Sequence, residues 1–227
     1  MTAEEREAMI LILASRKKTY KILHDFWINE PGTAQLENLY DPAFGVALDL
    51  LTPDDEESLR NTLESLYVEP NEFTEEYFQS VRRDYYNMIA AKGNMPKPPF
   101  ATKYLPLEQD AILEEMLTVR ATYERYGALH TEPSIEAEGY LAMELSFMSR
   151  TCGLAQQAVE LGVDRRATQL LDEQDWFLND HLLVWTKRWG EAVRNCGEDN
   201  FYTKLARLTE RFLVCDSKGL NDISDLL

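Results

Sequence analysis

The sequence predicts an all-α protein, a compact bundle of about eight or more helices in two sub-parts. Apolar residues recur at three- and four-residue spacings along almost the whole chain, whereas the alternation typical of strands is nearly absent. Ten glycines and nine prolines in 227 residues are too few for a loop-rich β protein. Because 44% of the residues are hydrophobic, the chain can bury one sizeable core or two small ones.

Periodicity and capping residues delimit the expected helices. Thr2 and Glu5 fit a capping box, and residues 52–55 (TPDD) combine a cap, a proline at the first helical position and acids that suit the helix dipole. Asn71 and Asp164 are further candidate caps. The first helix has a candidate break near Lys17. The expected helices span residues 3–30, 33–50, 53–67, 71–91, 107–127, 135–161, 164–195 and 200–215.

Two segments interrupt the helical pattern. Residues 92–106 contain Pro96, Pro98 and Pro99, which exclude regular helix and favour extended backbone. Residues 128–134 are a candidate hinge between an N-terminal helical part (1–127) and a C-terminal helical part (135–216), although a single domain also fits the pattern. The last residues, 217–227, are expected to form a flexible tail.

The protein is acidic, and its negative charge is localised. The net charge is −17, and residues 51–80 carry nine acids and one base, while residues 106–145 carry nine acids and two bases. Such a field repels nucleic acid and anionic lipid and attracts cationic ligands. The alternative interpretation is a surface that serves only solubility.

Cysteine usage and hydropathy indicate a cytoplasmic protein. Cys152, Cys196 and Cys215 form no CxxC motif and cannot all pair, which favours a reducing compartment. The early apolar run, residues 8–14, has about half the length of a membrane span. It is preceded by acids, where a secretory signal would carry positive charge. We therefore expect neither export nor membrane insertion.

The sequence shows no catalytic constellation. It contains no Glu-x-x-His pair, no zinc-ligand spacing and no glycine loop of the GxxxxGK or GxGxxG type. The acids at 54–57 resemble an aspartate-rich metal motif, but their place in the first helical turn favours capping. Cys152 has no obvious base partner and is expected to be a buried structural thiol. These absences favour a binding module without enzymatic activity, metal or cofactor.

Residues 177–189 (FLNDHLLVWTKRW) form the most informative helical stripe. Leu178, Leu182 and Trp189 are expected in the core. His181 fits either an interhelical hydrogen bond or a ligand contact, and Trp185 fits either the core or a ligand contact. Six residues of the stripe share one helix face: Phe177, Leu178, His181, Leu182, Trp185 and Trp189.

Three segments together carry a family resemblance: residues 84–105 (DYYNMIAAKGNMPKPPFATKYL), residues 136–149 (EAEGYLAMELSFMS), and the stripe followed by residues 201–213 (FYTKLARLTERFL). Their order and spacing resemble the TorD/DmsD family of cytoplasmic chaperones that mature molybdenum-containing redox enzymes. The resemblance covers roughly residues 26–213, weakly in the first third, and its last two motifs are the specific ones.

The chain departs from the family at one motif. The family's E-P-x-D-H helix start aligns without a gap onto residues 136–140 (EAEGY), so Gly139 replaces the aspartate and Tyr140 the histidine. A second register begins the motif at Glu132 and needs a four-residue insertion. In this register Ile135 replaces the aspartate and Glu136 replaces the histidine. The Asp–His pair is absent in either register, although acids persist nearby.

The resemblance implies an all-helical, TorD-like protein that binds the twin-arginine signal peptide or the apo form of a molybdenum-containing oxidoreductase. It would assist cofactor insertion and proofread export, as a monomer or a domain-swapped dimer. Carboxylates suit the two arginines, and rings suit the apolar stretch that follows them. The candidate peptide-binding residues are Glu132, Glu136, Glu138, Tyr140, His181 and Trp185; Asp84 and Tyr104 flank the proline segment and are expected to pin it.

Other functions remain open at this point. A helical ligand-sensing regulator, or another protein-interaction module, could use the basic cluster Arg16, Lys17, Lys18 and Lys21. The net charge and the missing helix-turn-helix disfavour contact with nucleic acid. A small helical enzyme could use a glutamate and His181 as acid and base. It needs a carboxylate beside His181, because Asp180 points about 100° away on the helix.

Overall fold

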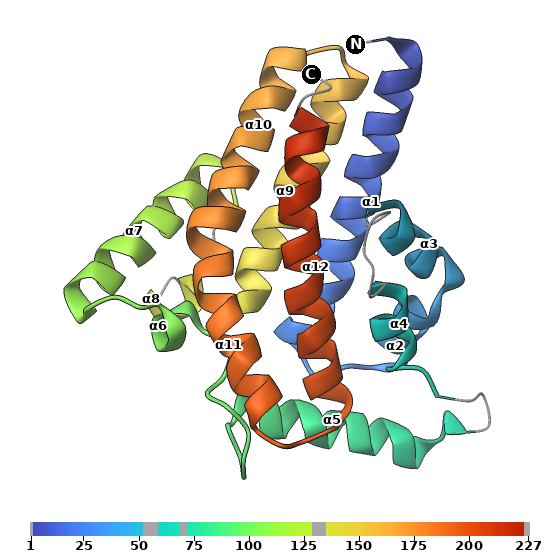
Figure 1. Cartoon of the computed structure of the whole chain (residues 1–227), viewed down its shortest axis with the longest axis vertical. Helices are drawn as coiled ribbons and strands as arrows, with labels where there is room; N and C mark the ends of the chain where they lie inside the picture. The colour runs from blue at the N-terminus through green and yellow to red at the C-terminus, as the bar shows by residue number, and fades with distance from the viewer. Residues whose placement is uncertain (1, 52–58, 69–71, 129–134, 225–227) are drawn as a thin grey trace.

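A computed structural model describes residues 2–51, 59–68, 72–128 and 135–224, and it confirms the predicted all-α class. Four long helices run side by side along the molecule, and α1 begins at the end of the bundle where α12 finishes (Figure 1). Within the described residues, the only extended pairing is an isolated antiparallel bridge. The four helices are α1 (Ala3–Ile28), α9 (Leu141–Glu160), α10 (Asp164–Trp176) and α12 (Phe201–Ser224).

Helix α1 begins at the predicted capping box. The Glu5 amide donates to Thr2 Oγ1 at 3.2 Å, and the Thr2 amide donates to the Glu5 carboxylate at 2.6 Å. The candidate break near Lys17 does not occur, and α1 is continuous. One face of the helix remains in the core throughout, including Leu13, Tyr20 and Trp27, so burial favours an unbroken helix.

On one side of the bundle lie α2 (Thr33–Tyr40), α3 (Pro42–Leu51) and α4 (Leu59–Glu64), with α5 (Glu75–Ile89) across its lower end (Figure 1). The expected helix 33–50 is interrupted at Asp41, whose carboxylate accepts the Ala43 amide at 2.9 Å. Pro42 then occupies the first position of α3, where a missing N–H costs nothing. Thr74 caps α5, whereas the candidate cap Asn71 and residues 52–55 lie outside the described residues.

On the opposite side lie α6 (Ala101–Tyr104), α7 (Gln109–Arg125) and α8 (Ile135–Glu138) (Figure 1). The proline segment is irregular, as predicted, except for the single turn α6. The expected helix 135–161 divides between α8 and α9, because Gly139 and Tyr140 pair with the proline segment.

The expected helix 164–195 is one continuous helix that contains a π-helical turn in its middle. Helix α10 passes into the π turn η2 (Phe177–Leu182) and then into α11 (Leu183–Asn195). Helix α12 continues to Ser224, so residues 217–224 are helical and do not belong to the flexible tail that the sequence predicted. Leu220 and Ile223 are buried in the core, which explains why the helix continues.

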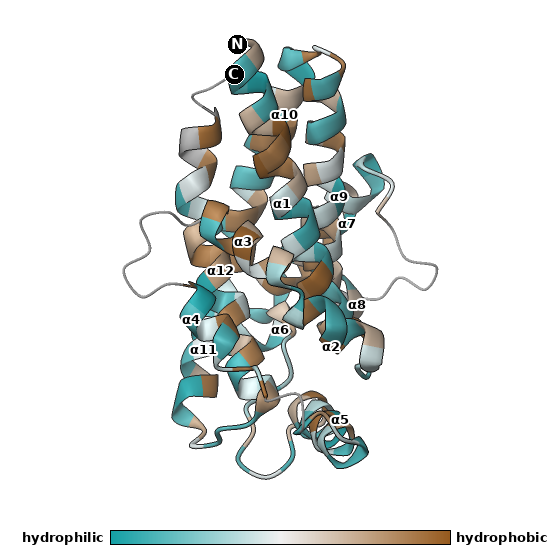
Figure 2. Ribbon diagram, turned by 90° about the vertical axis from the view of Figure 1, so that its right-hand side faces the viewer, coloured by the Kyte–Doolittle hydropathy of each residue, from teal (hydrophilic) through white to brown (hydrophobic). Residues whose placement is uncertain are grey.

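A shared hydrophobic core joins the N-terminal and C-terminal parts. It includes Leu23 and Trp27 from α1 and Leu145, Trp189 and Phe212 from the C-terminal part. Figure 2 shows hydrophobic stretches where the long helices face one another and hydrophilic ones on the outer surfaces. The hinge role of residues 128–134 stays a prediction, because residues 129–134 lie outside the described part. No described helix combines the length and the apolar composition needed to cross a membrane.

Candidate functional site

The proline segment folds back onto the residues that precede α9. The Ala101 amide donates to the Gly139 carbonyl at 2.7 Å, and the Leu141 amide donates to the Pro99 carbonyl at 3.0 Å. Between these bonds Phe100 and Tyr140 form the isolated bridge, and their rings stack with centroids 4.8 Å apart. The prolines favour this extended backbone. Two segments that the sequence singled out separately therefore form one surface.

Gly139 fits this pairing because it carries no side chain. A Cβ atom at this position would lie 2.8 Å from Met116 Sδ and 3.0 Å from Ala101 Cβ. Both distances are shorter than ordinary van der Waals contacts. The close approach of Met116 on α7 and of Ala101 in the proline segment therefore accounts for glycine where the TorD/DmsD motif has aspartate.

Tyr140 replaces the histidine of that motif and is anchored at both ends. Its hydroxyl donates to the Trp27 carbonyl, and its ring covers Phe100. Burial raises the pKa of Tyr140, so the hydroxyl remains protonated at neutral pH. Tyr140 thus supplies an aromatic face and no charge.

The carboxylate of Glu138 is buried beside α7. The residue is 3% exposed, and within the described part of the chain neither Oε1 nor Oε2 has a hydrogen-bond donor. Arg120 Nη1 lies 3.8 Å from Oε1, and the same guanidinium contacts Glu124 Oε1 at 3.4 Å. Burial raises the pKa of Glu138, and the charge of Arg120 opposes the rise. An unsatisfied buried carboxylate is costly and calls for a donor.

His181 lies in the π turn and joins two helices. Its Nδ1 is 2.6 Å from Glu115 Oε1 on α7, and its Nε2 is 2.8 Å from Glu144 Oε1 on α9. The Trp185 indole donates to the other oxygen of Glu144 at 3.0 Å. Burial alone would lower the pKa of His181, but the charge of Glu144 and the hydrogen bonds to both glutamates raise it to about 9. His181 is therefore an imidazolium at neutral pH.

The six residues of the stripe that share one helix face are all buried. Leu178, Leu182 and Trp189 lie in the core, as the spacing predicted. His181 and Trp185 are equally buried, so neither presents a surface to a peptide in this structure. His181 is the interhelical hydrogen-bond partner that the sequence allowed. Its partners, Glu115 and Glu144, were not identified from the sequence, because helical spacing cannot tell which carboxylates of other helices face it.

The two residues expected to pin the proline segment have different roles. The Tyr104 hydroxyl donates to the Lys97 carbonyl, which ties the middle of the segment to its C-terminal end, and the Tyr104 ring stacks on Trp185. Asp84 instead accepts the Phe201 amide at 3.3 Å and thereby links α5 to the start of α12. Of the other candidates, Glu132 lies outside the described residues, as does the side chain of Glu136.

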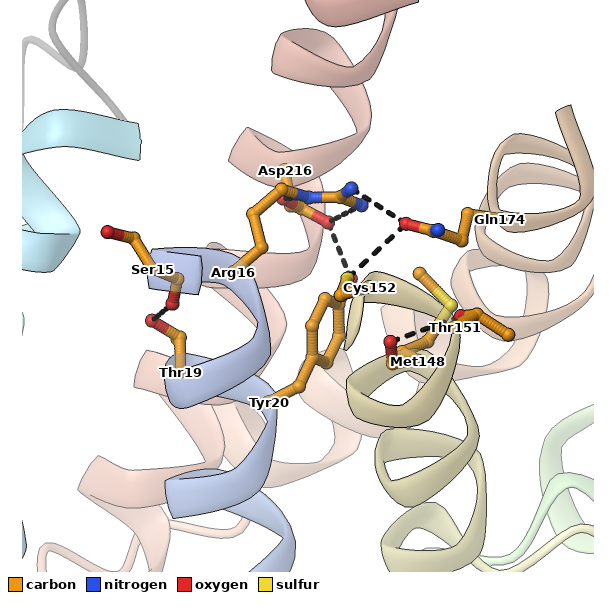
Figure 3. Close-up of polar contacts among 9 residues, drawn as sticks. All are labelled: Ser15, Arg16, Thr19, Tyr20, Met148, Thr151, Cys152, Gln174 and Asp216. Atoms are coloured by element: carbon orange, nitrogen blue, oxygen red, sulfur yellow. Dashed lines mark hydrogen bonds and ion pairs between the residues drawn. The ribbon is translucent and has the colours of Figure 1, made fainter. Parts of the chain in front are cut away.

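Within the basic cluster of the first helix Arg16 is buried, whereas Lys17, Lys18 and Lys21 are exposed. Arg16 is completely buried and donates from Nε and Nη2 to the two oxygens of Asp216, at 2.7 and 2.9 Å (Figure 3). Its Nη1 donates to Gln174 Oε1 at 2.7 Å, and the Tyr20 hydroxyl donates to Asp216 at 2.6 Å. Arg16 is therefore unavailable for the contact with nucleic acid that the sequence had already disfavoured, because its guanidinium is hydrogen-bonded inside the core.

Cys152 contacts this buried network. Its thiol donates to Gln174 Oε1 at 3.3 Å (Figure 3). Burial raises the pKa of Cys152 to about 12, so the thiol is protonated and unreactive at neutral pH. This supports the interpretation as a structural cysteine. Across residues 2–51, 59–68, 72–128 and 135–224, no three His, Cys, Asp or Glu side chains gather in a way that could hold a metal ion.

Comparison with known proteins places the chain in a family. Searches of curated proteins and of solved structures found no match. The sequence does match the family described as nitrate reductase delta subunit, over residues 49–190, which is more than half of the chain. The matched range includes the proline segment, Glu138 to Tyr140 and the stripe, in agreement with the TorD/DmsD resemblance. The chain therefore belongs to the nitrate reductase delta subunit family, whose members are redox-enzyme maturation chaperones.

Proposed function

We propose that this chaperone acts in the cytoplasm and binds the twin-arginine signal peptide, or the apo form, of a molybdenum-containing oxidoreductase. Binding would hold the client back from export until its cofactor is inserted. The observation that carries the proposal is the buried Glu138 carboxylate, whose two oxygens have no hydrogen-bond partner among the described residues. Glu138 stands two residues before Tyr140, whose ring stacks on Phe100.

The chemistry of Glu138 suits an arginine of the signal peptide. A guanidinium offers a planar fork of N–H donors that matches the two oxygens of a carboxylate. Arg120 is 3.8 Å away and donates no hydrogen bond to Glu138, so it only partly compensates the charge. Because Glu138 is buried, an incoming arginine would first have to displace Arg120, which is about one third exposed and already contacts Glu124. The acid-rich range 106–145, which contains Glu138, would attract the basic segment.

The aromatic residues suit the apolar stretch that follows the two arginines. Phe100 and Tyr140 are partly exposed and form one stacked face. Behind the proline segment, Trp185 stacks on Tyr104 and is held by Glu144. We therefore assign peptide contact to Glu138 and Tyr140 and a positioning role to His181 and Trp185. Glu132 and Glu136 precede this surface in the sequence and remain candidates for the second arginine.

The enzymatic alternative has a carboxylate beside His181 and still gains no support. Glu115 and Glu144 both contact the imidazole, but His181 is completely buried and already holds its proton between two charges. A general acid or base needs access to its substrate. We therefore interpret this triad as structural.

Isothermal titration with a synthetic signal peptide from a molybdenum-containing oxidoreductase tests the proposal. The peptide with two arginines should bind, and its double-lysine variant should bind more weakly, because lysine cannot form the bidentate fork. Glu138→Gln should weaken binding about tenfold or more. The matched control is Glu124→Gln, which removes the exposed carboxylate on the same arginine and should leave binding nearly unchanged. Absence of heat with every such peptide, together with no precursor in pull-downs, would overturn the proposal.

A further inference from the structure

A second candidate site lies on the other side of the bundle from α6–α8, where α2 ends and the chain approaches α5 (Figure 1). A cavity of about 460 Å³ opens to solvent there. Aromatic and acidic residues line it: Glu37, Tyr40, Asp41, Tyr67, Val68 and Phe73. No part of the proposed signal-peptide site contributes to it.

Three rings meet in this cavity at steep angles. The Tyr40 ring lies 4.9 Å from that of Tyr67, at 82°, and 5.5 Å from that of Phe73, at 65°. Tyr40 is fixed in place, because its hydroxyl donates to the Leu66 carbonyl at 3.0 Å and lies 2.6 Å from the Tyr77 hydroxyl. The rings therefore form a concave surface with Tyr40 at its base. We call Tyr40, Tyr67 and Phe73, with Glu37 and Asp41, the aromatic cage.

The rim of the aromatic cage carries negative charge. Glu37 is exposed, and among the described residues no cation lies within ion-pair distance of it. Asp41 shares only a 3.5 Å contact with Lys18, and the Ala43 amide lowers the pKa of Asp41, so it remains ionised. Tyr67 and Phe73 also belong to the acid-rich range 51–80. The one base in the range 51–80, Arg60, is paired with Asp49. The cage therefore combines π faces with two carboxylates: that of Glu37, which no described cation neutralises, and that of Asp41, which has one long contact with Lys18.

We propose that the aromatic cage binds an arginine side chain presented by a polypeptide partner. A guanidinium stacks flat on aromatic rings and donates at the same time to a carboxylate, which this combination of Tyr40, Tyr67 and Glu37 allows. The cavity is large and open enough to accept the aliphatic stem of the side chain as well. Because the cage is remote from Glu138, this inference does not depend on the proposed function.

Ligand-observed NMR titration tests the inference on the full chain in a Glu138→Gln background, which removes the other candidate arginine site. The probe is N-acetylarginine methylamide, and the neutral isostere is N-acetylcitrulline methylamide. The arginine probe should bind, and the citrulline probe should bind at least about tenfold more weakly, because it lacks the cation. Equal binding of both probes would overturn the inference. Tetramethylammonium is the third probe, and tighter binding of it would assign the cage to small quaternary cations instead.

Variants then locate the binding. Tyr67→Leu and Phe73→Leu keep an apolar side chain and remove one π face, and each should weaken the arginine probe several-fold. Glu37→Gln should weaken it about threefold. The matched control is Tyr86→Leu, which removes an exposed tyrosine outside the cage and should not change binding. Circular dichroism checks that each variant is folded. Unchanged affinity in folded Tyr67→Leu and Phe73→Leu variants would place the probe elsewhere and overturn the inference.

Discussion

His181 Nε2 lies 2.8 Å from Glu144 Oε1, and both side chains are completely buried. Glu115 contacts the opposite nitrogen, so one imidazolium joins α7, the π turn and α9. Burial of the imidazolium costs free energy, and the two carboxylates more than offset this cost, because the pKa of His181 is raised. The pair is consequently sensitive to the loss of either partner. It also fixes the position of Trp185, whose indole donates to Glu144 directly behind the proline segment.

The raised pKa of His181 predicts that stability falls as pH rises. The folded protein holds the His181 proton up to pH of about 9, whereas the unfolded chain releases it near its ordinary value of about 6.5. The stabilisation is therefore fully present below pH 6.5 and is lost as pH rises through 9, with a total on the order of 3 kcal/mol. Urea unfolding at pH 6.5, 7.5 and 9 measures it. His181→Gln should flatten this dependence, and an unchanged slope in that variant would contradict the assignment.

Replacement of the buried Glu144 should reduce the free energy of unfolding more than replacement of the partly exposed Glu115. Glu144→Gln leaves a buried imidazolium without its closest charge, and we expect a loss of about 3–5 kcal/mol in the free energy of unfolding. Glu115 is about one quarter exposed, so solvent can replace it in part, and Glu115→Gln should cost about 1 kcal/mol. Urea denaturation of the two variants compares them directly. Equal losses would mean that the two carboxylates share the charge evenly.

Local signals in the sequence were sufficient for much of the fold. The start of α1 at Thr2, the irregular proline segment and the core positions Leu178, Leu182 and Trp189 all follow from capping, proline stereochemistry and periodicity. The break at Asp41 was missed although Pro42 signals it. A proline is disfavoured inside a helix and suits the first position of the next one.

Contacts between distant residues could not be predicted in the same way. Arg16 and Asp216 are 200 positions apart, and Arg16 stands next to two lysines, so a solvated basic cluster was the natural interpretation. Only the tertiary packing of α1 against α12 shows that its guanidinium points inward. The same holds for Glu115 and Glu144, and for Glu138, whose missing hydrogen bonds no sequence pattern reveals.

The Arg16–Asp216 pair should be costly to break and tolerant of joint replacement. Arg16→Met or Asp216→Leu alone leaves one buried charge without a partner, and each should cost about 3–5 kcal/mol. The double variant removes both charges and should recover most of that loss. Chemical denaturation of the three variants gives the coupling energy. Additive losses would show that the two charges do not stabilise each other.

Gly139 provides a test of why the Asp–His pair is absent from this chain. Gly139→Ala adds a Cβ against Met116 Sδ and Ala101 Cβ, and overpacking at this contact should cost about 1–3 kcal/mol. Gly139→Asp, which installs the family's residue, should cost more, because it also puts a second carboxylate beside the unsatisfied Glu138.

Gly219→Ala is the matched control: it lies in α12, the nearest atom to an added Cβ is 3.8 Å away, and it should be neutral or stabilising by up to about 1 kcal/mol. Thermal unfolding ranks the three variants. If Gly139→Asp were as stable as the parent, close packing would not explain the glycine, and the proline segment would have to be able to move away from α8. In that case the Phe100–Tyr140 stack, on which the proposed peptide surface depends, would also be adjustable.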